Sequence, residues 1–413
     1  MQIDFATSDH ASLGIEWELQ VVDPATRALV GAAGEILDDL QAARGGQEHP
    51  KAKHELFESI VEVLTGVCDT VGEATADLAG TIAEVAAAAE RRGLALACAG
   101  THPLARWQDQ SLSPGPRYAQ LVDDMQWLAR RLLITGVHVH VGIRSVDKVV
   151  PVLNAVTGYL PHFLALSASS PYWAGADTGL ASARSKVFEQ LPTAGLPQQL
   201  AGWDDFETYL GSLVSSKAIA TIREVWWDVR PHPEFGTVEL RMCDGLPTMV
   251  EVGAVAALAQ CLVHQFDTLL DRGYTLPRPT PWLLRENKWR AARHGLEAEL
   301  IIDDAGTVQP VRAALDDLVD ELTPVARRLG CETELARVRE LAAGPGPAGR
   351  QRAAVAAAGG DVGAAVDLLL AEFAAGAPAG FAAGAPADVP GHAAAPASPD
   401  HAAAGAGAGT RAW

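Results

Sequence analysis

Pairs of side chains that can bind metal ions or phosphate recur in three short stretches of the sequence. In each stretch a single apolar residue separates the two members of the pair, so both would lie on one face of a β-strand and apolar residues on the other. The three pairs are Glu16 and Glu18, His138 and His140, and Glu239 and Arg241. Adjacent carboxylates repel each other unless a cation lies between them. The pattern therefore predicts a site for polyvalent cations on the polar face of a sheet.

Simple solvent exposure is the alternative explanation for each stretch taken alone. A half-exposed strand of an antiparallel sheet also alternates apolar and polar residues, and its glutamates are often only solvated. Two histidines at strand spacing, such as His138 and His140, are uncommon on a strand that is merely exposed. The recurrence of the same design in three stretches favours the cation site.

The elements that would position these pairs follow from periodicity and from turn residues. Besides the strands that carry the pairs, strands are predicted at 28–30, 94–99 and 226–231. Helices are predicted at about 70–92, 117–132, 145 onward with a break at Pro161, and 248–270. From about Leu283 the pattern is helical throughout, with helices at 286–294 and 309–329 and two shorter ones up to about Phe373.

Residues 53–64 fit two kinds of element. In a strand, Glu58 and Glu62 would share a face with Ile60, whereas in a helix Glu55, Glu58 and Glu62 would share a face. The periodicity leaves both elements open.

Composition narrows the class of protein. The chain of 413 residues carries a net charge of −19 and shows no basic stripe interleaved with aromatic residues, which argues against a nucleic-acid partner. Its five cysteines are scattered and form no Cys-x-x-Cys pair, as suits free thiols in a reducing cytoplasm. We see no signal peptide and no uninterrupted run of about 20 apolar residues, so we expect a cytoplasmic protein without a membrane partner. Residues 376–413, rich in Ala, Gly and Pro, are predicted to form a disordered tail.

A nucleotide, if one is used, would have to be bound without a glycine-rich phosphate loop. The sequence contains no G-x-x-x-x-G-K-[ST] motif, no G-x-G-x-x-G that opens a helix after a strand, and no G-x-S-x-G elbow. Cations and arginines would hold the phosphates instead, with Arg241 on the same strand face as Glu239. Because Mg²⁺ usually takes one or two protein carboxylates, the candidates are too many for one ion, and we expect two or three ions. These candidates are Glu16, Glu18, Glu55, Glu62 and Glu239.

Several short segments occur in an order that is typical of one protein family. They are GIEWE at 14–18, GVHVHVG at 136–142, WDVRP at 227–231 and GTVELR at 236–241, with shorter ones at 100–103, 161–163, 169–172 and 293–297. Together they resemble the bacterial carboxylate–amine ligases of the glutamate–cysteine ligase type 2 family. The resemblance runs from about residue 10 to about residue 373 and excludes the tail.

The resemblance implies a glutamine-synthetase-like α+β fold, in which a curved, mainly antiparallel sheet carries the active site and helices pack on its outer side. It implies one catalytic domain over residues 1–375 and ATP-dependent ligation with magnesium. The γ-carboxylate of glutamate would attack the γ-phosphate of ATP to form γ-glutamyl phosphate and ADP. The amine of cysteine would then displace phosphate to form γ-glutamylcysteine.

The resemblance also implies roles for individual residues. The metal ligands of the family match Glu16, Glu18, Glu55, Glu62, His138 and Glu239, and its phosphate-facing arginine matches Arg241. His140 fits either a metal bond or a contact with a nucleotide phosphate. On chemistry and loop position only, Arg184 and Arg230 are candidates for holding substrate carboxylates, with structural ion pairs as the alternative. Glu58 is a candidate base for the incoming ammonium, with a structural role as its alternative.

Two other classes of function stay open at this stage. One is a metal-dependent hydrolase of an amide or phosphate ester, although such sites usually carry more histidine and aspartate. The other is a degenerate binding protein, against which the intact set of ligands argues. Within the ligase class, family membership does not determine the amine, and the sequence leaves a homo-oligomer open. We expect glutamine at position 16 or 239 to abolish turnover and leave the fold intact.

Overall fold

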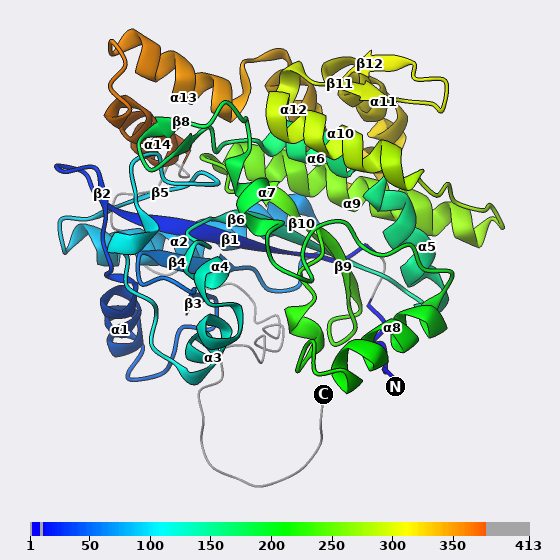
Figure 1. Ribbon diagram of the computed structural model, residues 1–413, viewed down its shortest axis with the longest axis horizontal. Helices are drawn as coiled ribbons and strands as arrows, with labels where there is room; N and C mark the ends of the chain where they lie inside the picture. The colour runs from blue at the N-terminus through cyan, green and yellow to red at the C-terminus, as the bar shows by residue number, and fades with distance from the viewer. Residues whose placement is uncertain (1, 9–10, 377–413) are drawn as a thin grey trace, which may run out of the picture.

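One eight-stranded sheet organises the protein, which is described here by a computed structural model covering residues 2–8 and 11–376 (Figure 1). Six strands follow the order β3-β4-β1-β6-β10-β9, and β2 and β5 pair with the far end of β1. Every pairing in this sheet is antiparallel. The strands are β1 (Leu13–Asp23), β2 (Ala28–Leu29), β3 (Ala52–His54), β4 (Ile60–Leu64), β5 (Ala95–Ala97), β6 (Gly136–Gly142), β9 (Val229–His232) and β10 (Thr237–Asp244).

Helices surround this sheet, and the C-terminal ones gather at the top of Figure 1 in yellow to orange. The first part of the chain forms α1 (Ala33–Ala43), α2 (Val71–Glu90), α3 (Pro116–Met125), α4 (Trp127–Arg130), α5 (Val146–Thr157), α6 (Leu160–Ser167), α7 (Ala183–Phe188) and α8 (Trp203–Ser215). The second part forms α9 (Met249–Asp271), α10 (Pro281–His294), α11 (Val311–Leu329), α12 (Glu332–Ala343), α13 (Gly346–Ala357) and α14 (Gly363–Gly376). Two small hairpins are formed by β7 (Tyr172–Trp173) with β8 (Ala176–Asp177) and by β11 (Glu299–Ile301) with β12 (Val308–Pro310).

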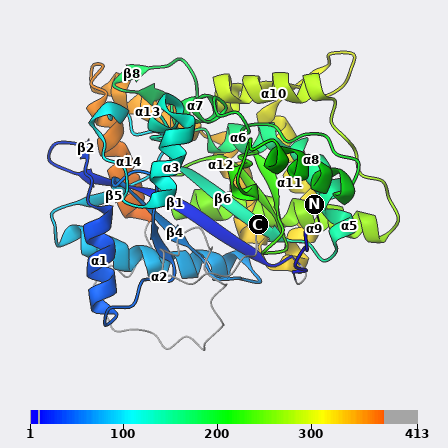
Figure 2. The same ribbon diagram turned by 60° about the horizontal axis from the view of Figure 1, so that its bottom comes forward.

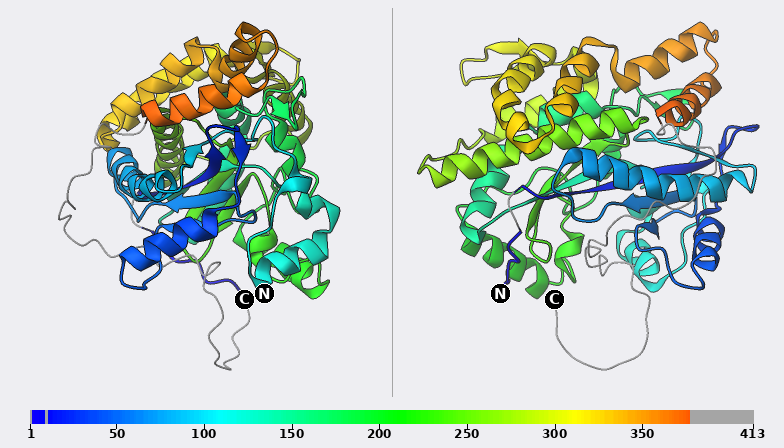
Figure 3. Two further views of the ribbon diagram at one scale, coloured as in Figure 1. Left: turned by 90° about the vertical axis from the view of Figure 1, so that its left-hand side faces the viewer. Right: turned by 180° about the vertical axis from the view of Figure 1, so that it is seen from behind.

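The sheet has one apolar face and one polar face, as the alternation in the sequence predicts. Trp17, Val139 and Leu240 on the apolar face are at most 1% exposed and belong to the main hydrophobic core. The long helices α2 and α9 run across this face and contact each other (Figure 3), and α1 lies beside α2 (Figure 2). Burial of the apolar side chains under these helices therefore leaves the polar side chains on the opposite face of the sheet.

Several local predictions are confirmed. Helix α2 begins at a capping box formed by Thr70 and Glu73, and the chain turns away at Gly93, which has a φ of 70°. Helices α5 and α6 are bent by 56° relative to each other, with Pro161 in the first turn of α6. Residues 53–64, which the periodicity left open, form the strands β3 and β4 with a turn between them.

Other predictions are wrong. The chain is not helical throughout after Leu283, because the β11–β12 hairpin lies between α10 and α11, and three helices rather than two follow α11. Gly359 and Gly360, both with positive φ, separate the last two of these helices. The helix predicted at 117–132 is divided at Gln126, whose φ is 50°. Of the predicted tail, Gly376 is the last residue of helix α14, and residues 377–413 lie outside the described residues.

In the described part of the chain, α9 is long and apolar enough to cross a membrane, and the bent pair α5 and α6 passes the same test together. The rest of the protein buries 83% of the most apolar window of α9. This burial is typical of a core helix in a soluble fold. The five cysteines are all buried and free, as predicted.

A buried ion triad fixes the start of β9. Nζ of Lys288 on α10 lies 2.5 Å from a carboxylate oxygen of Asp228 and 2.5 Å from one of Glu189, and Lys288 is only 2% exposed. Replacing Lys288 with methionine would leave the buried carboxylate of Asp228 without its cation. We therefore expect Lys288→Met to lower the free energy of unfolding by about 3 kcal/mol in denaturant titrations.

Lys186→Met is the matched control for this substitution. Lys186 also pairs with Glu189, at 2.9 Å, but its side chain is 27% exposed. A partly exposed pair contributes less than about 1 kcal/mol. Equal losses of stability in the two variants would contradict the role of the triad.

Candidate active site

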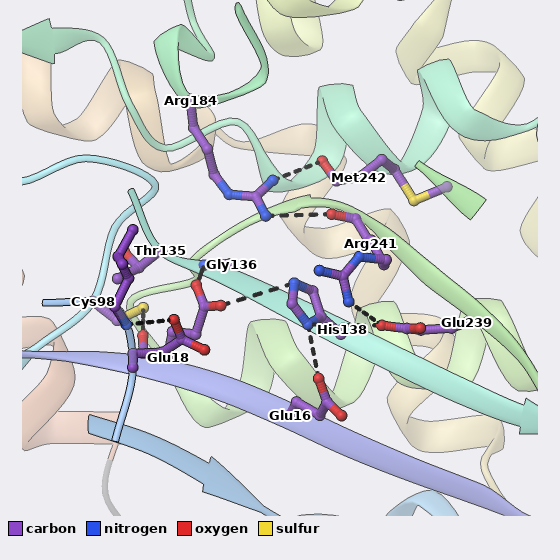
Figure 4. Close-up of polar contacts among 12 residues, drawn as sticks. Glu16, Glu18, Cys98, Thr135, Gly136, His138, Arg184, Glu239, Arg241 and Met242 are labelled. Carbon is purple, nitrogen blue, oxygen red and sulfur yellow. Dashed lines mark hydrogen bonds and ion pairs between the residues drawn. The ribbon is translucent and has the colours of Figure 1, made fainter. Parts of the chain in front are cut away.

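The register of the central strands brings the predicted pairs next to one another on the polar face. Glu16 on β1 lies opposite His138 on β6, and Glu18 lies opposite Glu62 on β4. On β10, Glu239 lies opposite His140 of β6 on one side and Arg230 of β9 on the other. Figure 4 shows side chains of β1, β6 and β10 pointing toward one another. Segments far apart in the sequence thus form one continuous polar site.

Glu16 lies at the centre of this site. Its carboxylate is 2.9 Å from Nδ1 of His138 (Figure 4). It is also 3.2 Å from Nε2 of His140. Burial would raise the pKa of Glu16, but its hydrogen bonds with His138 and His140 outweigh burial and hold that pKa well below its usual value. Glu16 is therefore an ionised carboxylate held between two imidazoles.

Burial and charge set different protonation states for the two histidines. Burial, assisted by the positive charge of Arg241, lowers the pKa of His138 to about 4, so its imidazole is neutral near pH 7 and keeps a lone pair for a cation. Burial also disfavours the charged form of His140, but Glu239 and Glu16 outweigh it and raise the pKa of His140. Nδ1 of His140 lies 3.0 Å from the hydroxyl of Thr237.

Glu239 is completely buried between two guanidinium groups. Nε of Arg230 donates to Oε2 of Glu239 at 2.6 Å, and a nitrogen of Arg241 donates to Oε1. Burial alone would raise the pKa of Glu239, but Arg230 and Arg241 hold it well below its usual value. Arg230 also donates hydrogen bonds to the backbone carbonyls of Arg223 and Val225. Most of the hydrogen-bonding capacity of Arg230 is therefore used within the protein.

Three carboxylates gather at the other end of the site. Oxygen atoms of Glu18, Glu55 and Glu62 lie within 4.8 Å of one another. Burial and the neighbouring charge of Glu55 raise the pKa of Glu18 well above its usual value, and Glu62 adds to this effect. One oxygen of Glu18 accepts a hydrogen bond from the backbone nitrogen of Gly136 at 2.5 Å. Like charges held this close favour the binding of a cation.

Two further groups of potential ligands overlap with this one. Donor atoms of Glu16, Glu62 and His138 lie within 4.8 Å of one another, and so do those of Glu16, His140 and Glu239. Glu16 belongs to two of the three groups, and Glu62 also belongs to two. The structure therefore brings together every residue that the sequence analysis names as a metal ligand, and His140 with them.

Two cavities adjoin the row of carboxylates. One, of about 140 Å³, is lined by Glu18, Glu55, Glu62, His138, Arg184, Arg230 and Arg241, among others. The other, of about 210 Å³, is lined by His140, Thr237 and Phe235 together with the start of β1. Glu16 and Leu64 line both cavities, so the two meet at the centre of the site.

Several cations that line these cavities were not predicted from the sequence. Arg117 and Arg223 line the smaller cavity, and Lys51 and Lys53 line the larger one. Lys51 and Lys53 are two residues apart just before Glu55, so strand periodicity could have indicated them. Arg117, in the first turn of α3, carries no comparable signal. Glu58, the candidate base, lines neither cavity, and its side chain packs against Gly31.

Comparison with solved structures shows that this fold occurs in another protein of known structure. The crystal structure of glutamate–cysteine ligase from Francisella tularensis in complex with AMP matches with a TM-score of 0.65 at 13% sequence identity, over 92% of this chain and 91% of that chain. At this identity the likeness concerns the fold alone. The predicted fold class is thereby confirmed.

Sequence relatives are much closer. A protein of Frankia casuarinae named "Putative glutamate--cysteine ligase 2-1" is 59% identical over 92% of this chain and 99% of its own length. A Thermobifida fusca protein named "Putative glutamate--cysteine ligase 2" is 52% identical over 92% of this chain and 95% of its own. The model of glutamate–cysteine ligase family 2 matches residues 12–367, and the chain belongs to that family.

Proposed function

We propose that the protein is an ATP-dependent carboxylate–amine ligase that joins glutamate to cysteine through γ-glutamyl phosphate, in the cytoplasm. The observation that carries this proposal is the continuous row of donor atoms from Glu55 to Glu239, with arginines along the same cavity. Family membership and the AMP-bound relative of the same fold support the use of ATP. γ-Glutamylcysteine would be the product.

The donor set fits magnesium ions. Carboxylate oxygens are the ligands that Mg²⁺ prefers, and it leaves its remaining positions to water and phosphate oxygens. Glu16, Glu18, Glu55, Glu62, His138 and Glu239 would hold two or three such ions. When bound, these ions would neutralise phosphate charge and so reduce its repulsion of the attacking carboxylate. The raised pKa of Glu18 supports this proposal, because it reflects burial and the neighbouring carboxylates Glu55 and Glu62, whose charge a bound cation would offset.

The arginines would complete the charge balance. Arg241 keeps its guanidinium beside Glu239, and its buried Nε has no hydrogen-bond partner among the described residues. It would stabilise negative charge as the phosphoryl group moves to the acid. The γ-carboxylate of glutamate is already ionised at neutral pH, so its attack needs no base. Arg184 and Arg230 remain our candidates for the substrate carboxylates.

The larger cavity suits a nucleotide. Lys51, Lys53 and His140 line it and would contact phosphates. The ring of Phe235 also lines it and would pack against the nucleobase. Because it meets the smaller cavity at Glu16, a nucleotide there and an amino acid on the other side would face each other across the carboxylates. His140 would then contact a phosphate or share in holding an ion.

A coupled assay of ADP formation tests this proposal. L-Glutamate and L-cysteine are supplied together and singly, with Mg·ATP, and products are identified by mass spectrometry. We expect ADP and γ-glutamylcysteine in equal amounts only when both amino acids are present. A panel of other acids and amines in the same assay identifies a different acceptor. Hydrolysis of amides or phosphate esters without ATP consumption would overturn the ligase proposal in favour of the hydrolase.

Magnesium is expected to stabilise the fold in the absence of any substrate. Binding at a hundredfold excess over the dissociation constant adds about 2.7 kcal/mol to the free energy of unfolding. Thermal unfolding is measured with EDTA, with MgCl₂, and with NaCl at matched ionic strength. Glu62→Gln, which removes a carboxylate from two donor groups, should reduce the shift. An equal shift with NaCl would contradict a magnesium site.

A further inference from the structure

Among the residues that the structure describes, no carboxylate pairs with the buried cation of Arg184. It is 3% exposed, lines the smaller cavity, and forms no ion pair within 4.0 Å in the described part of the chain. Its guanidinium instead approaches the backbone carbonyls of Arg241, at 3.3 Å, and Met242, at 3.5 Å (Figure 4). Its Nε has no hydrogen-bond partner among the described residues. A buried guanidinium held only by long bonds to carbonyls can bind an anion strongly.

A β-bulge in β10 makes these carbonyls available. Leu240 pairs with Val139 and Cys243 pairs with Val137, so β10 has one residue more than β6 over this interval. Such a bulge leaves backbone groups unpaired and re-aims the side chains that follow it. Cys243 consequently faces the apolar core, and Asp244 faces the polar side, opposite Gly136.

Asp244 holds the segment that carries Arg184. It is 0% exposed, and its carboxylate accepts hydrogen bonds from the backbone nitrogen of Ser169 at 3.0 Å, the hydroxyl of Ser170 at 2.6 Å and the hydroxyl of Ser182 at 2.8 Å. The hydroxyl of Ser170 in turn accepts from the backbone nitrogen of Arg184 at 3.0 Å. Ser182 caps α7, because its hydroxyl accepts from the backbone nitrogen of Ser185 at 3.2 Å. One carboxylate thus connects the end of β10 to the first turn of α7.

The directions of these hydrogen bonds require Asp244 to act as an acceptor. Both hydroxyls already accept from backbone nitrogens, so each has its own proton left to donate to the carboxylate. Burial raises the pKa of Asp244, whereas the charge of Arg184 and the three donors oppose this and favour the ionised form. An asparagine at this position would present a donor where an acceptor is needed.

Two glycines leave room for this arrangement. A Cβ atom at Gly136 would lie 2.3 Å from a guanidinium nitrogen of Arg184. A Cβ atom at Gly100 would lie 2.6 Å from the carboxylate of Asp244. Neither distance is tolerated between non-bonded atoms, so both glycines are needed for the close packing of Asp244 and Arg184 against the strands.

We propose that Asp244 is a positioning residue, which sets Arg184 over the β10 bulge so that its guanidinium binds a carboxylate of the amino-acid substrate. This role rests on the proposed ligase function for the identity of the anion. In the proposed function the phosphate chemistry belongs to Glu239, before the bulge, and to the side chain of Arg241, within it. Asp244 lies after the bulge and acts on acid recognition through Ser170 and Ser182.

Steady-state kinetics of Asp244→Asn provide the first test. We expect the KM for L-glutamate to rise about tenfold, as for loss of a charge-assisted hydrogen bond, with the KM for ATP unchanged and kcat within about twofold. In the Arg184→Ala background, Asp244→Asn should add nothing further, because it acts through Arg184. Multiplicative effects in the double variant, or equal effects on the two KM values, would overturn the proposal.

Thr178→Ala is the matched control for this test. Its hydroxyl donates to the carbonyl of Pro171 at 2.8 Å within the same loop, without contact to Asp244 or Arg184. We expect its kinetic constants to equal those of the wild type. A rise of the KM for L-glutamate equal to that in Asp244→Asn would mean that any loosening of this loop has the same effect, and it would overturn the specific role of Asp244.

Crystal structures of the full chain and of Asp244→Asn, without substrates, provide a second test that does not depend on the reaction. We expect the guanidinium of Arg184 to leave the carbonyls of Arg241 and Met242 in the variant. If it stays in place, Asp244 does not position it. If the wild type consumes no ATP with L-glutamate, the proposed function fails, and the comparison of the two crystal structures still decides the role of Asp244.

Discussion

Glu239→Gln is expected to abolish ATP-dependent turnover and also to destabilise the fold. The side chain is completely buried and neutralises Arg230 and Arg241 at once. Loss of its charge leaves two nearly buried guanidinium groups without their counter-ion, which costs about 3 kcal/mol. Turnover should fall at least about 100-fold, because a proposed metal ligand is lost and Arg241 is no longer oriented. The expectation of an intact fold, drawn from the sequence, therefore has to be revised at this position.

Glu251→Gln is the control variant that distinguishes a loss of stability from a loss of catalytic activity. Glu251 is 3% exposed and accepts a hydrogen bond from Arg350 at 2.7 Å, in a part of the protein that lines neither cavity. The Glu251→Gln variant should have a lower free energy of unfolding. Its turnover should change little at a temperature where both it and Glu239→Gln are folded. Full activity of Glu239→Gln under these conditions would contradict our account of the site.

Glu16→Gln is expected to abolish turnover and leave the fold intact. The side chain is 19% exposed, faces both cavities, and belongs to two of the three donor groups. Glutamine keeps its shape and can still accept from His138 or His140, so the free energy of unfolding should change by less than about 1 kcal/mol. Turnover should fall at least about 100-fold, since charge is removed where the groups of ligands overlap.

The stabilisation by magnesium provides a readout for Glu16→Gln that does not depend on substrates. The increase in unfolding temperature on addition of MgCl₂ should shrink or vanish in this variant. Glu58→Gln, which changes a carboxylate outside both cavities, should keep the wild-type increase and the wild-type activity. A large loss of stability in Glu16→Gln would mean that this carboxylate is needed for the fold itself.

The polar face could be predicted because it depends on local alternation. Trp17 and Val139 are buried where a strand period of two places them, and Glu16 and His138 consequently face the other way. The chain between these strands includes a helix that was not predicted, α1. The neighbourhood of Glu16 and His138 therefore follows from long-range pairing of β1 with β6. The recurrence of the pairs and the resemblance to a family indicated a shared site but not this register.

The arrangement around Arg184 illustrates what periodicity cannot provide. The bulge in β10 changes which face Asp244 occupies, and no residue in the stretch marks it. By simple alternation from Glu239, Asp244 would face the core with Leu240. Its actual partners, Ser170 and Ser182, are more than 60 residues away along the chain. Such contacts depend on the conformations of short loops and helix ends, which periodicity in a single sequence does not predict.

The division of the sheet into an apolar and a polar face also determines how this protein can misfold. A slip of β1 by one residue against β6 would turn Glu16 and Glu18 into the core and expose Trp17 to water. No compact molecule could survive that exchange, so misassembled copies should be lost to aggregation or proteolysis. Substitutions on the apolar face that weaken this register are therefore expected to yield less soluble protein, and the molecules that do fold should keep their activity.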